Sequence, residues 1–293
     1  MSTFGVSSYF LWTQKGQTVL PLVRGSGFLV QFRQLSTFYE YHVLSAAHVT
    51  CPVRHRKIYG DSVGFKAIGE RHISTRLLLA DATTHKVRSS HALEFRQQFM
   101  PNTDVASLRL TKEKEFKAVA ASSSLEAVEL DLEPIEEGEA LVLCGMNAEE
   151  ERANPNDDGL TLTPMRLNAT CKAALLSIDY GTVLLASIDG SAEATAAAAT
   201  AGSSPSEAVT APPPLPLSMC GGPVLRRSSG KCVGVIAARV MKNAPPRDPR
   251  SAALYQDPYL DISEHLSLHP HWPLDVAIVP IGEFYDPLRR CEM

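Results

Sequence analysis

The sequence lacks several features that would assign it to a specialised class. No apolar run approaches the roughly 18 residues that a membrane-spanning helix needs, and the N-terminus has no basic stretch followed by an apolar one, so we expect neither a membrane protein nor a secretory signal. Only 6 cysteines occur among 293 residues, and none form a Cys-x-x-Cys pair, which argues against a disulfide scaffold and a structural zinc site.

The charge pattern also argues against nucleic-acid partners. The net charge is −4 and Lys and Arg are scattered, apart from a short basic run at 54–57 that we interpret as a solvated loop, so we expect no nucleic-acid binding. No cofactor is expected either. We expect a cytoplasmic protein; a mitochondrial one is the alternative, because no acidic residue precedes Glu40 and Ser and Thr are frequent there.

Short apolar runs separated by Gly, Pro, Asn or Asp dominate what is present. Runs of this length and composition predict the strands of a β-barrel or sandwich. They lie at 27–32, 40–48, 104–110, 140–145, 181–188, 232–240 and 275–281. The best helical candidate, 112–130, lies between two groups of strands and is interpreted as the connection between two β lobes.

The segment 190–216 differs in composition from the rest. It is rich in Ala, Ser, Thr and Pro, with no aromatic residue, Lys or Arg. Such a segment has too little apolar surface to offset its ordering entropy, so it is predicted to be a disordered insertion. It ends immediately before the sequence "PLSMCGGPVL" (216–225).

Three distant pieces carry side chains suited to nucleophilic catalysis. "VLSAAHV" places His48 just after a strand, "NTDVASLRL" places Asp104 at the head of another, and "SMCGGPVL" places Cys220 in a Gly-Gly turn. A cysteine is a competent nucleophile, an adjacent imidazolium favours its thiolate, and a carboxylate fixes the tautomer of the imidazole. Each piece alone is weak evidence, because a single His or Asp near a strand usually has a structural role.

Together these pieces resemble the chymotrypsin-like protease superfamily, and most closely its HtrA/Deg branch. The resemblance rests on "GSGFLV" followed by "VLSAAHV", on "DVASLRL", and on "CGGPVL" followed by "GKCVGVIAARV". "EEGEALVLCG" and "LDVAIVPIGEFYDPL" resemble the strands that open and close the second barrel of that branch.

The resemblance implies an all-β fold of two six-stranded antiparallel β-barrels with the active site in the cleft between them. The expected organisation is an N-terminal segment (1–22), a first barrel (23–120), a connection (121–134) and a second barrel (135–289) that contains the insertion.

The resemblance also implies roles for individual residues. Cys220 would be the nucleophile, His48 the general base and Asp104 the orienting carboxylate of an endopeptidase, which acts on a peptide or protein substrate. The backbone of Ser218 and Cys220 would form the oxyanion hole. The substrate cleft would include a strand segment at Ala237, Ala238 and Arg239. Picornavirus-type proteases use this fold with a cysteine in a similar loop.

Two departures from the family's pattern support an alternative function. The family has Gly where this chain has Ser218, and a side chain there disfavours the loop conformation that aims the N–H at the oxyanion. Arg239 occupies a position usually held by a small residue, where it would either favour acidic substrates or block the pocket. The alternative is an inactive pseudoprotease that binds a partner protein through the cleft or the insertion.

Other motifs carry weaker hypotheses. The histidines of "HLSLHPHW" (265–272) could ligate a metal, but the prolines indicate a loop and no further ligand is suitably spaced, so no metal site is expected. "NAT" at Asn168 matches a glycosylation sequon. The acidic segment 148–158 is interpreted as a solvated loop, with calcium binding as the less favoured alternative.

Overall fold

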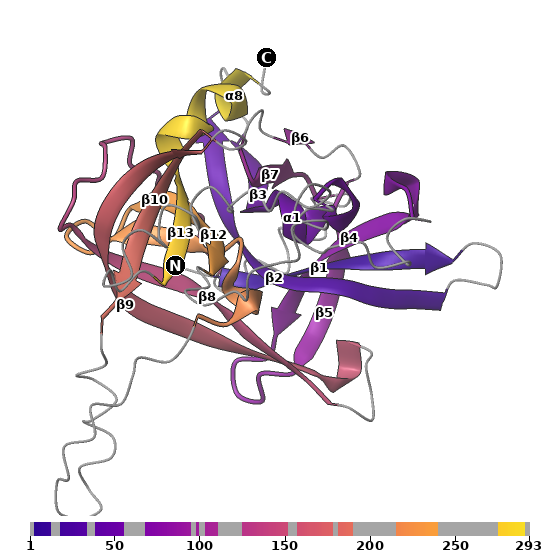
Figure 1. The fold of residues 1–293 in the computed structure, drawn as a ribbon. Helices are drawn as coiled ribbons and strands as arrows, with labels where there is room; N and C mark the ends of the chain where they lie inside the picture. The colour runs from indigo at the N-terminus through magenta and orange to yellow at the C-terminus, as the bar shows by residue number, and fades with distance from the viewer. Residues whose placement is uncertain are drawn as a thin grey trace, which may run out of the picture.

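The computed structural model describes residues 3–12, 18–33, 39–55, 68–94, 98–99, 103–110, 125–151, 157–177, 181–189, 215–239 and 275–290. These residues form two antiparallel β lobes packed side by side, which confirms the predicted double-barrel, chymotrypsin-like architecture (Figure 1). All seven of the predicted strand runs contain a strand.

The first lobe is a seven-stranded sheet with the order β5-β4-β1-β2-β3-β7-β6. Its two ends approach each other after β5 and β7, because Leu93 pairs with Leu110 in an isolated bridge and Glu94 N–H donates to the Arg109 carbonyl at 2.7 Å. Its strands are β1 (Thr3–Trp12), β2 (Thr18–Arg33), β3 (Tyr39–Ala46), β4 (Ile73–Ala80), β5 (Val87–Ala92), β6 (Gln98–Phe99) and β7 (Val105–Leu108).

The first lobe begins earlier in the chain than the sequence suggested. Residues 1–22 were expected to form a separate segment, but β1 pairs with both β2 and β4, and Phe4 and Val6 are fully buried. The apolar spacing of these residues is that of a half-buried strand. The start of the chain therefore belongs to the first sheet.

The second lobe is a closed six-stranded barrel with the order β10-β13-β12-β11-β8-β9. Gly221 and Gly222 precede β11 and connect it to the turn that carries Cys220. The strands are β8 (Ala140–Glu150), β9 (Leu160–Ser177), β10 (Gly181–Ile188), β11 (Pro223–Arg226), β12 (Cys232–Arg239) and β13 (Val276–Pro280).

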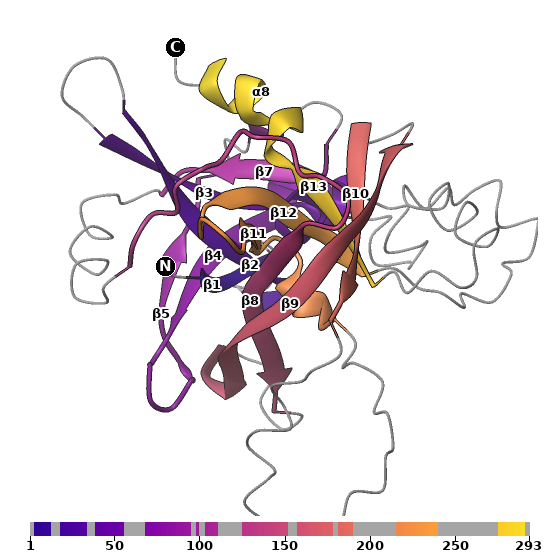
Figure 2. The same ribbon diagram turned by 90° about the vertical axis from the view of Figure 1, so that its left-hand side faces the viewer.

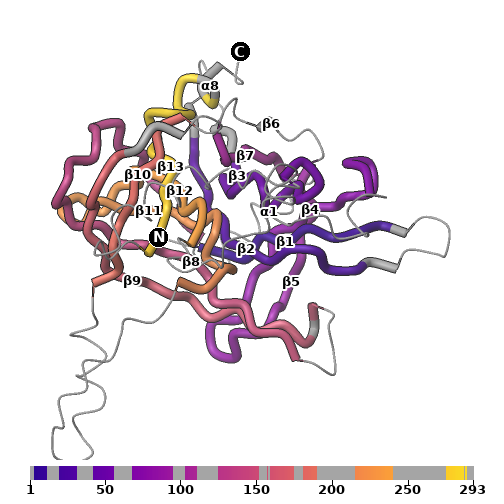
Figure 3. The backbone as a smooth tube through the Cα atoms, in the orientation of Figure 1, coloured from indigo at the N-terminus to yellow at the C-terminus, as the bar shows by residue number. Residues whose placement is uncertain are grey.

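Short helical elements occupy the ends and turns of these strands. Among the described residues, two are α-helical, α1 (Ala47–Thr50) and α8 (Tyr285–Arg290). The others are 3₁₀ turns: η2 (Pro52–Arg54), η3 (Glu70–His72), η4 (Asp157–Gly159), η5 (Leu217–Met219) and η6 (Ile281–Glu283). Figure 3 shows α8 next to the end of β13, where Phe284 and Leu288 are fully buried.

The described part of the connection between the lobes, 125–139, is extended rather than helical. Val128 bridges Val30 of the first lobe, and Leu130 bridges Cys232 of the second. The helix predicted over 112–130 is therefore wrong for 125–130, because pairing with both lobes provides backbone partners that the local pattern does not reveal; residues 111–124 lie outside the described residues.

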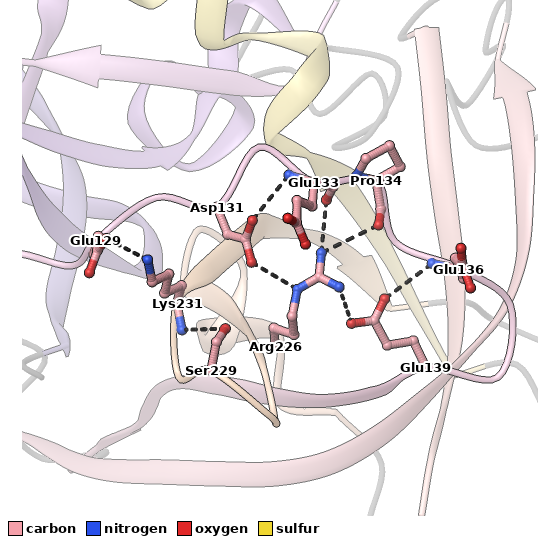
Figure 4. A network of polar contacts seen from close by, with 9 residues as sticks. All are labelled: Glu129, Asp131, Glu133, Pro134, Glu136, Glu139, Arg226, Ser229 and Lys231. Carbon is pink, nitrogen blue, oxygen red and sulfur yellow. Dashed lines mark hydrogen bonds and ion pairs between the residues drawn. The ribbon is translucent and has the colours of Figure 1, made fainter.

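A network of polar contacts ties this connection to the second barrel (Figure 4). Arg226 at the end of β11 pairs with Asp131 at 2.8 Å and with Glu139, and it also donates to the carbonyls of Glu133 and Pro134. Because the guanidinium has five donors in a rigid fork, one side chain can hold the 131–139 loop in this way.

The two lobes share one apolar core. Its members come from both lobes and from α8, and their burial removes apolar surface of both lobes from water. They include Phe28, Val30, Leu44, Val105, Val235, Ala237, Ala277, Val279, Phe284 and Leu288.

The hairpin of β8 and β9 also reaches across to the first lobe, where β8 runs beside β1 and β2 (Figures 1 and 2). Leu162 N–H donates to the His85 carbonyl at 2.8 Å, and Leu160 and Leu162 pack on Leu78. The far end of the second barrel is thus fixed to the first lobe.

The remaining predictions concern the insertion, the other cysteines and membrane-spanning segments. Residues 190–214 of the predicted insertion lie outside the described residues, whereas Leu215 is buried in the second barrel. Cys51, Cys144, Cys171 and Cys232 are buried free thiols. Within the described ranges, no helix has the length and hydropathy to cross a membrane.

Candidate active site

His48 and Asp104 are brought together by the pairing of β3 with β7. Ala46, the last residue of β3, lies opposite Val105, the first residue of β7. His48 follows in α1, and Asp104 immediately precedes β7, so the ends of two neighbouring strands place both side chains at one edge of the first lobe.

Asp104 holds His48 through two bonds. Its Oδ2 lies 2.6 Å from His48 Nδ1, and its Oδ1 accepts from the His48 backbone N–H at 2.9 Å. The Asp104 carbonyl also accepts from Ala47 N–H at 3.0 Å. Asp104 is fully buried and His48 is 6% exposed. The carboxylate therefore fixes both the backbone and the ring of the histidine.

The electrostatics of this pair favour a charged imidazole. Burial opposes the charge, but Asp104 and, to a smaller extent, a hydrogen bond and the charge of Cys220 raise the pKa of His48 to about 10. Burial likewise opposes ionisation of Asp104, but the charge and hydrogen bonds of His48 hold the pKa of the Asp104 carboxyl below its usual value. The pair is an ion pair at neutral pH.

Cys220 lies beside His48. It is 3% exposed, and its thiol is close enough for the hydrogen bond that contributes to the raised pKa of His48. It packs with the apolar core of the first lobe, although its turn belongs to the second. The structure therefore brings all three sequence-predicted residues together at the junction of the lobes.

The two glycines after Cys220 are required by space. Gly221 has φ of +89°, and a Cβ there would lie 2.3 Å from both the Ser26 carbonyl and Ser45 Oγ. A Cβ on Gly222 would lie 2.0 Å from the Cys144 carbonyl. The Cys-Gly-Gly turn is therefore pressed between the two lobes, and no residue larger than glycine fits at either position.

The motif Gly25-Ser26-Gly27 on β2 lies directly against this turn. Ser26 N–H donates to the Cys220 carbonyl at 2.8 Å. A Cβ on Gly25 would lie 2.9 Å from that same carbonyl and 2.5 Å from Val49. The sequence resemblance rested partly on this motif, and the structure gives it a physical role, which is to let the nucleophile turn approach β2 closely.

The predicted oxyanion hole is closed in this structure. The Cys220 backbone N–H, one of its two predicted donors, is bonded to the Leu217 carbonyl at 3.1 Å within η5. An N–H that is bonded to a carbonyl cannot at the same time stabilise an oxyanion. Only a rearrangement of the 217–220 segment would release it.

The three predicted cleft residues differ in accessibility. Ala237 is fully buried in the core shared by the lobes, so it does not line a cleft; a register shift between Ile236 and Ala238 on β12 turns it inward. Ala238 is half-buried and Arg239 is exposed at the end of the strand. Of the three, only Ala238 and Arg239 are accessible.

His55 was not predicted from the sequence to lie at the candidate site. We interpreted the basic run at 54–57 as a solvated loop, and Arg54 is indeed exposed, with an ion pair to Glu70. His55, however, is half-buried, and its ring lies edge-on to His48, with 6.4 Å between the ring centroids. Burial lowers the pKa of His55 in spite of the nearby Asp104. The only sequence signal was its position seven residues after His48.

The weaker candidates gain no support. Residues 265–272 lie outside the described residues, and within the described ones no grouping of His, Cys, Asp and Glu could hold a metal ion. Asn168 is half-buried on β9 opposite Val142. A hollow of about 580 Å³ lies beside Arg226, but it is lined by the acidic 133–139 loop and includes none of the triad residues.

Comparison with known proteins gives fold-level similarity only. No family model and no curated protein matches the chain. It is similar to the crystal structure of the Rv3671c protease in an inactive form, with 14% identity, a TM-score of 0.43, and coverage of 98% of this chain and 87% of that chain. It is also similar to the HtrA-type protease AlgW with a decapeptide, with 10% identity, a TM-score of 0.47, and coverage of 98% of this chain but only 62% of that one.

Proposed function

We propose that the protein is an endopeptidase that uses Cys220 as its nucleophile, His48 as its acid and base, and Asp104 as the carboxylate that orients His48. The observation that carries the proposal is the buried cluster in which His48 Nδ1 lies 2.6 Å from Asp104 Oδ2 and the Cys220 thiol lies within hydrogen-bonding reach of the same ring. Nucleophile, base and orienting group in this order are what acyl transfer requires.

The reaction follows from these positions. The Cys220 thiolate attacks the carbonyl carbon of the scissile peptide bond, and the charge passes to the carbonyl oxygen. When the tetrahedral intermediate collapses, the C–N bond breaks and the His48 imidazolium gives its proton to the departing amine, leaving a thioester on Cys220. Neutral His48 then takes a proton from water, which attacks the thioester and releases the acid product.

A second candidate is supported by a specific observation. The bond between Cys220 N–H and the Leu217 carbonyl leaves the tetrahedral intermediate without this oxyanion donor, and one such donor contributes about 10²–10³-fold to the rate. The second candidate is accordingly a pseudoprotease, which would bind a partner protein through the cleft beside Arg239 or through the 190–216 insertion.

Cleavage of a peptide library by the wild type, Cys220→Ala and Cys220→Ser separates the two candidates. The endopeptidase predicts cleavage by the wild type, none by Cys220→Ala, and at most weak cleavage by Cys220→Ser. Cleavage that persists in Cys220→Ala, or is absent from all three proteins, would exclude the endopeptidase as proposed.

A second measurement does not depend on finding a substrate. Iodoacetamide should alkylate Cys220 faster than the buried Cys144 and Cys232 at neutral pH, and the excess should disappear in His48→Ala. If Cys220 reacts no faster than these two thiols, the catalytic assignment is wrong.

A further inference from the structure

The closed oxyanion hole depends on one peptide group, between Leu217 and Ser218. Its carbonyl and its N–H point in opposite directions because the peptide is planar and trans. While the Leu217 carbonyl points at the Cys220 N–H, the Ser218 N–H points away from the same place. A half-turn of this peptide would remove the carbonyl and direct both N–H groups at a substrate oxygen.

That half-turn changes two dihedral angles, ψ of Leu217 and φ of Ser218. Leu217 is 70% exposed, so few neighbouring atoms oppose the change in its ψ angle. Ser218 lies in the 3₁₀ turn η5 with negative φ, since His85 is the single non-glycine residue of positive φ in the described part of the chain. The rotation would carry φ of Ser218 into the positive region, where a Cβ is disfavoured and glycine is not.

The remaining groups of Ser218 are held in place. Its Oγ accepts from the Ala148 N–H at 3.0 Å, and its carbonyl accepts from Ser26 Oγ at 2.7 Å. Ser26 Oγ in turn accepts from the Met146 N–H at 2.8 Å. Both serines are buried. The side chain of Ser218 therefore cannot swing away to relieve the strain that the rotation would create.

The edge of β8 explains why a hydroxyl is useful at this position. β11 pairs with β8 only at Leu141–Leu143, so the N–H groups of Met146 and Ala148, further along β8, have no β11 residue opposite them. The hydroxyls of Ser26 and Ser218 accept from them instead. Glycine at 218 would leave the Ala148 N–H without this acceptor, and an unpaired buried N–H is costly.

We propose that Ser218 is a positioning residue that holds the oxyanion hole closed: its Cβ opposes the rotation of the 217–218 peptide, and its hydroxyl fixes that Cβ against β8. We call this restraint on the 217–218 peptide the lock. Its effect on turnover rests on the proposed endopeptidase function, whereas the restraint itself does not.

The test compares Ser218→Gly with Ser218→Ala. The Gly variant removes both the Cβ and the hydroxyl, and the Ala variant removes the hydroxyl alone. Ser229→Gly, in the exposed turn after β11, is the matched control for a Ser-to-Gly change in the same barrel. Each variant is first checked for an unchanged near-ultraviolet circular dichroism spectrum.

Amide hydrogen exchange measures directly how firmly the 217–218 peptide is held in the closed conformation. Because the Cys220 N–H is released when the peptide turns, its exchange should be at least about tenfold faster in Ser218→Gly, less affected in Ser218→Ala, and unchanged in Ser229→Gly. Unchanged exchange in Ser218→Gly, or equal acceleration in the Gly and Ala variants, would overturn the proposal.

Peptide hydrolysis measures the effect of opening the oxyanion hole on turnover. Since one oxyanion donor is worth about 10²–10³-fold, kcat should rise at least about tenfold in Ser218→Gly, with KM little changed. Iodoacetamide alkylation, which needs no oxyanion hole, should not rise with it. Faster exchange without hydrolysis in any variant would support the lock and refute the endopeptidase; hydrolysis that falls in Ser218→Gly would overturn the lock.

Discussion

The two halves of the candidate site differ in how they are held. The half from the first lobe, His48 and Asp104, is fixed at the ends of two paired strands and has the geometry that proton transfer needs. The half from the second lobe, the 217–220 turn, places the Cys220 thiol beside His48 but turns the Leu217 carbonyl onto the Cys220 N–H.

The difference shows which parts of such a site can change state. Moving the backbone of His48 away from Asp104 would require breaking the pairing of β3 with β7, which is continuous over four residue pairs. Opening the oxyanion hole requires the rotation of one peptide, between the exposed Leu217 and the buried Ser218. The charge relationships of the site are therefore permanent features of the fold, whereas the stabilisation of a transition state depends on a local conformation.

The largest expected effect is in the fixed half. Asp104→Asn keeps the size of the side chain but removes its charge and presents an N–H to His48, which favours the wrong tautomer. We expect kcat to fall about 10⁴-fold, as in other enzymes with this arrangement. The measurement is peptide hydrolysis; a fall of less than about tenfold would show that Asp104 does not orient the base.

The pH dependence of stability tests the same half without a substrate. Because the folded-state pKa of His48, about 10, lies above its unfolded value of about 6.5, the charged ring contributes its full stability below pH ~6.5, and this contribution is lost as the pH rises through about 10. The melting temperature should fall across this range in the wild type and fall less in His48→Gln. Parallel profiles for the two proteins would contradict the ion pair.

A smaller effect is expected from the link between the halves. Ser26→Ala removes the donor to the Ser218 carbonyl and the acceptor of the Met146 N–H, both buried. Leaving such groups unpaired should cost about 1–3 kcal/mol in the free energy of unfolding. Urea denaturation measures this, and Ser229→Gly should show no comparable loss. A neutral Ser26→Ala would mean that β2 does not hold the turn.

The smallest effect is expected at His55. At neutral pH this ring is uncharged, because burial lowers its pKa, so His55→Gln should change the alkylation rate of Cys220 by less than about threefold. In the acidic range, below the lowered pKa of His55, a protonated His55 beside the charged His48 should disfavour the imidazolium, and the variant should lose this dependence. Identical acid limbs would show that the two histidines are not coupled.

Much of the fold could be predicted from local patterns. Short apolar runs between breakers predicted the strands, and their order together with the flanks of His48, Asp104 and Cys220 indicated two barrels with one site. The patterns failed where tertiary contacts prevailed: β1 was assigned to a separate segment, residues 125–130 were predicted to be helical, and Ala237 was placed in the cleft. In each case the partner strand or core lies far away in the sequence.

The sequence by itself determined which chemical groups are available: a histidine just after a strand, a carboxylate at the head of another, a cysteine in a Gly-Gly turn, and a serine where the resembling family has glycine. Only the tertiary structure decided the state of the oxyanion hole and the position of His55. The state of the oxyanion hole depends on backbone dihedral angles and on bonds among Ser26, Met146, Ala148 and Ser218, which lie up to 192 residues apart in the chain. No local pattern encodes them, because a hydrogen bond between distant segments exists only after the lobes have packed.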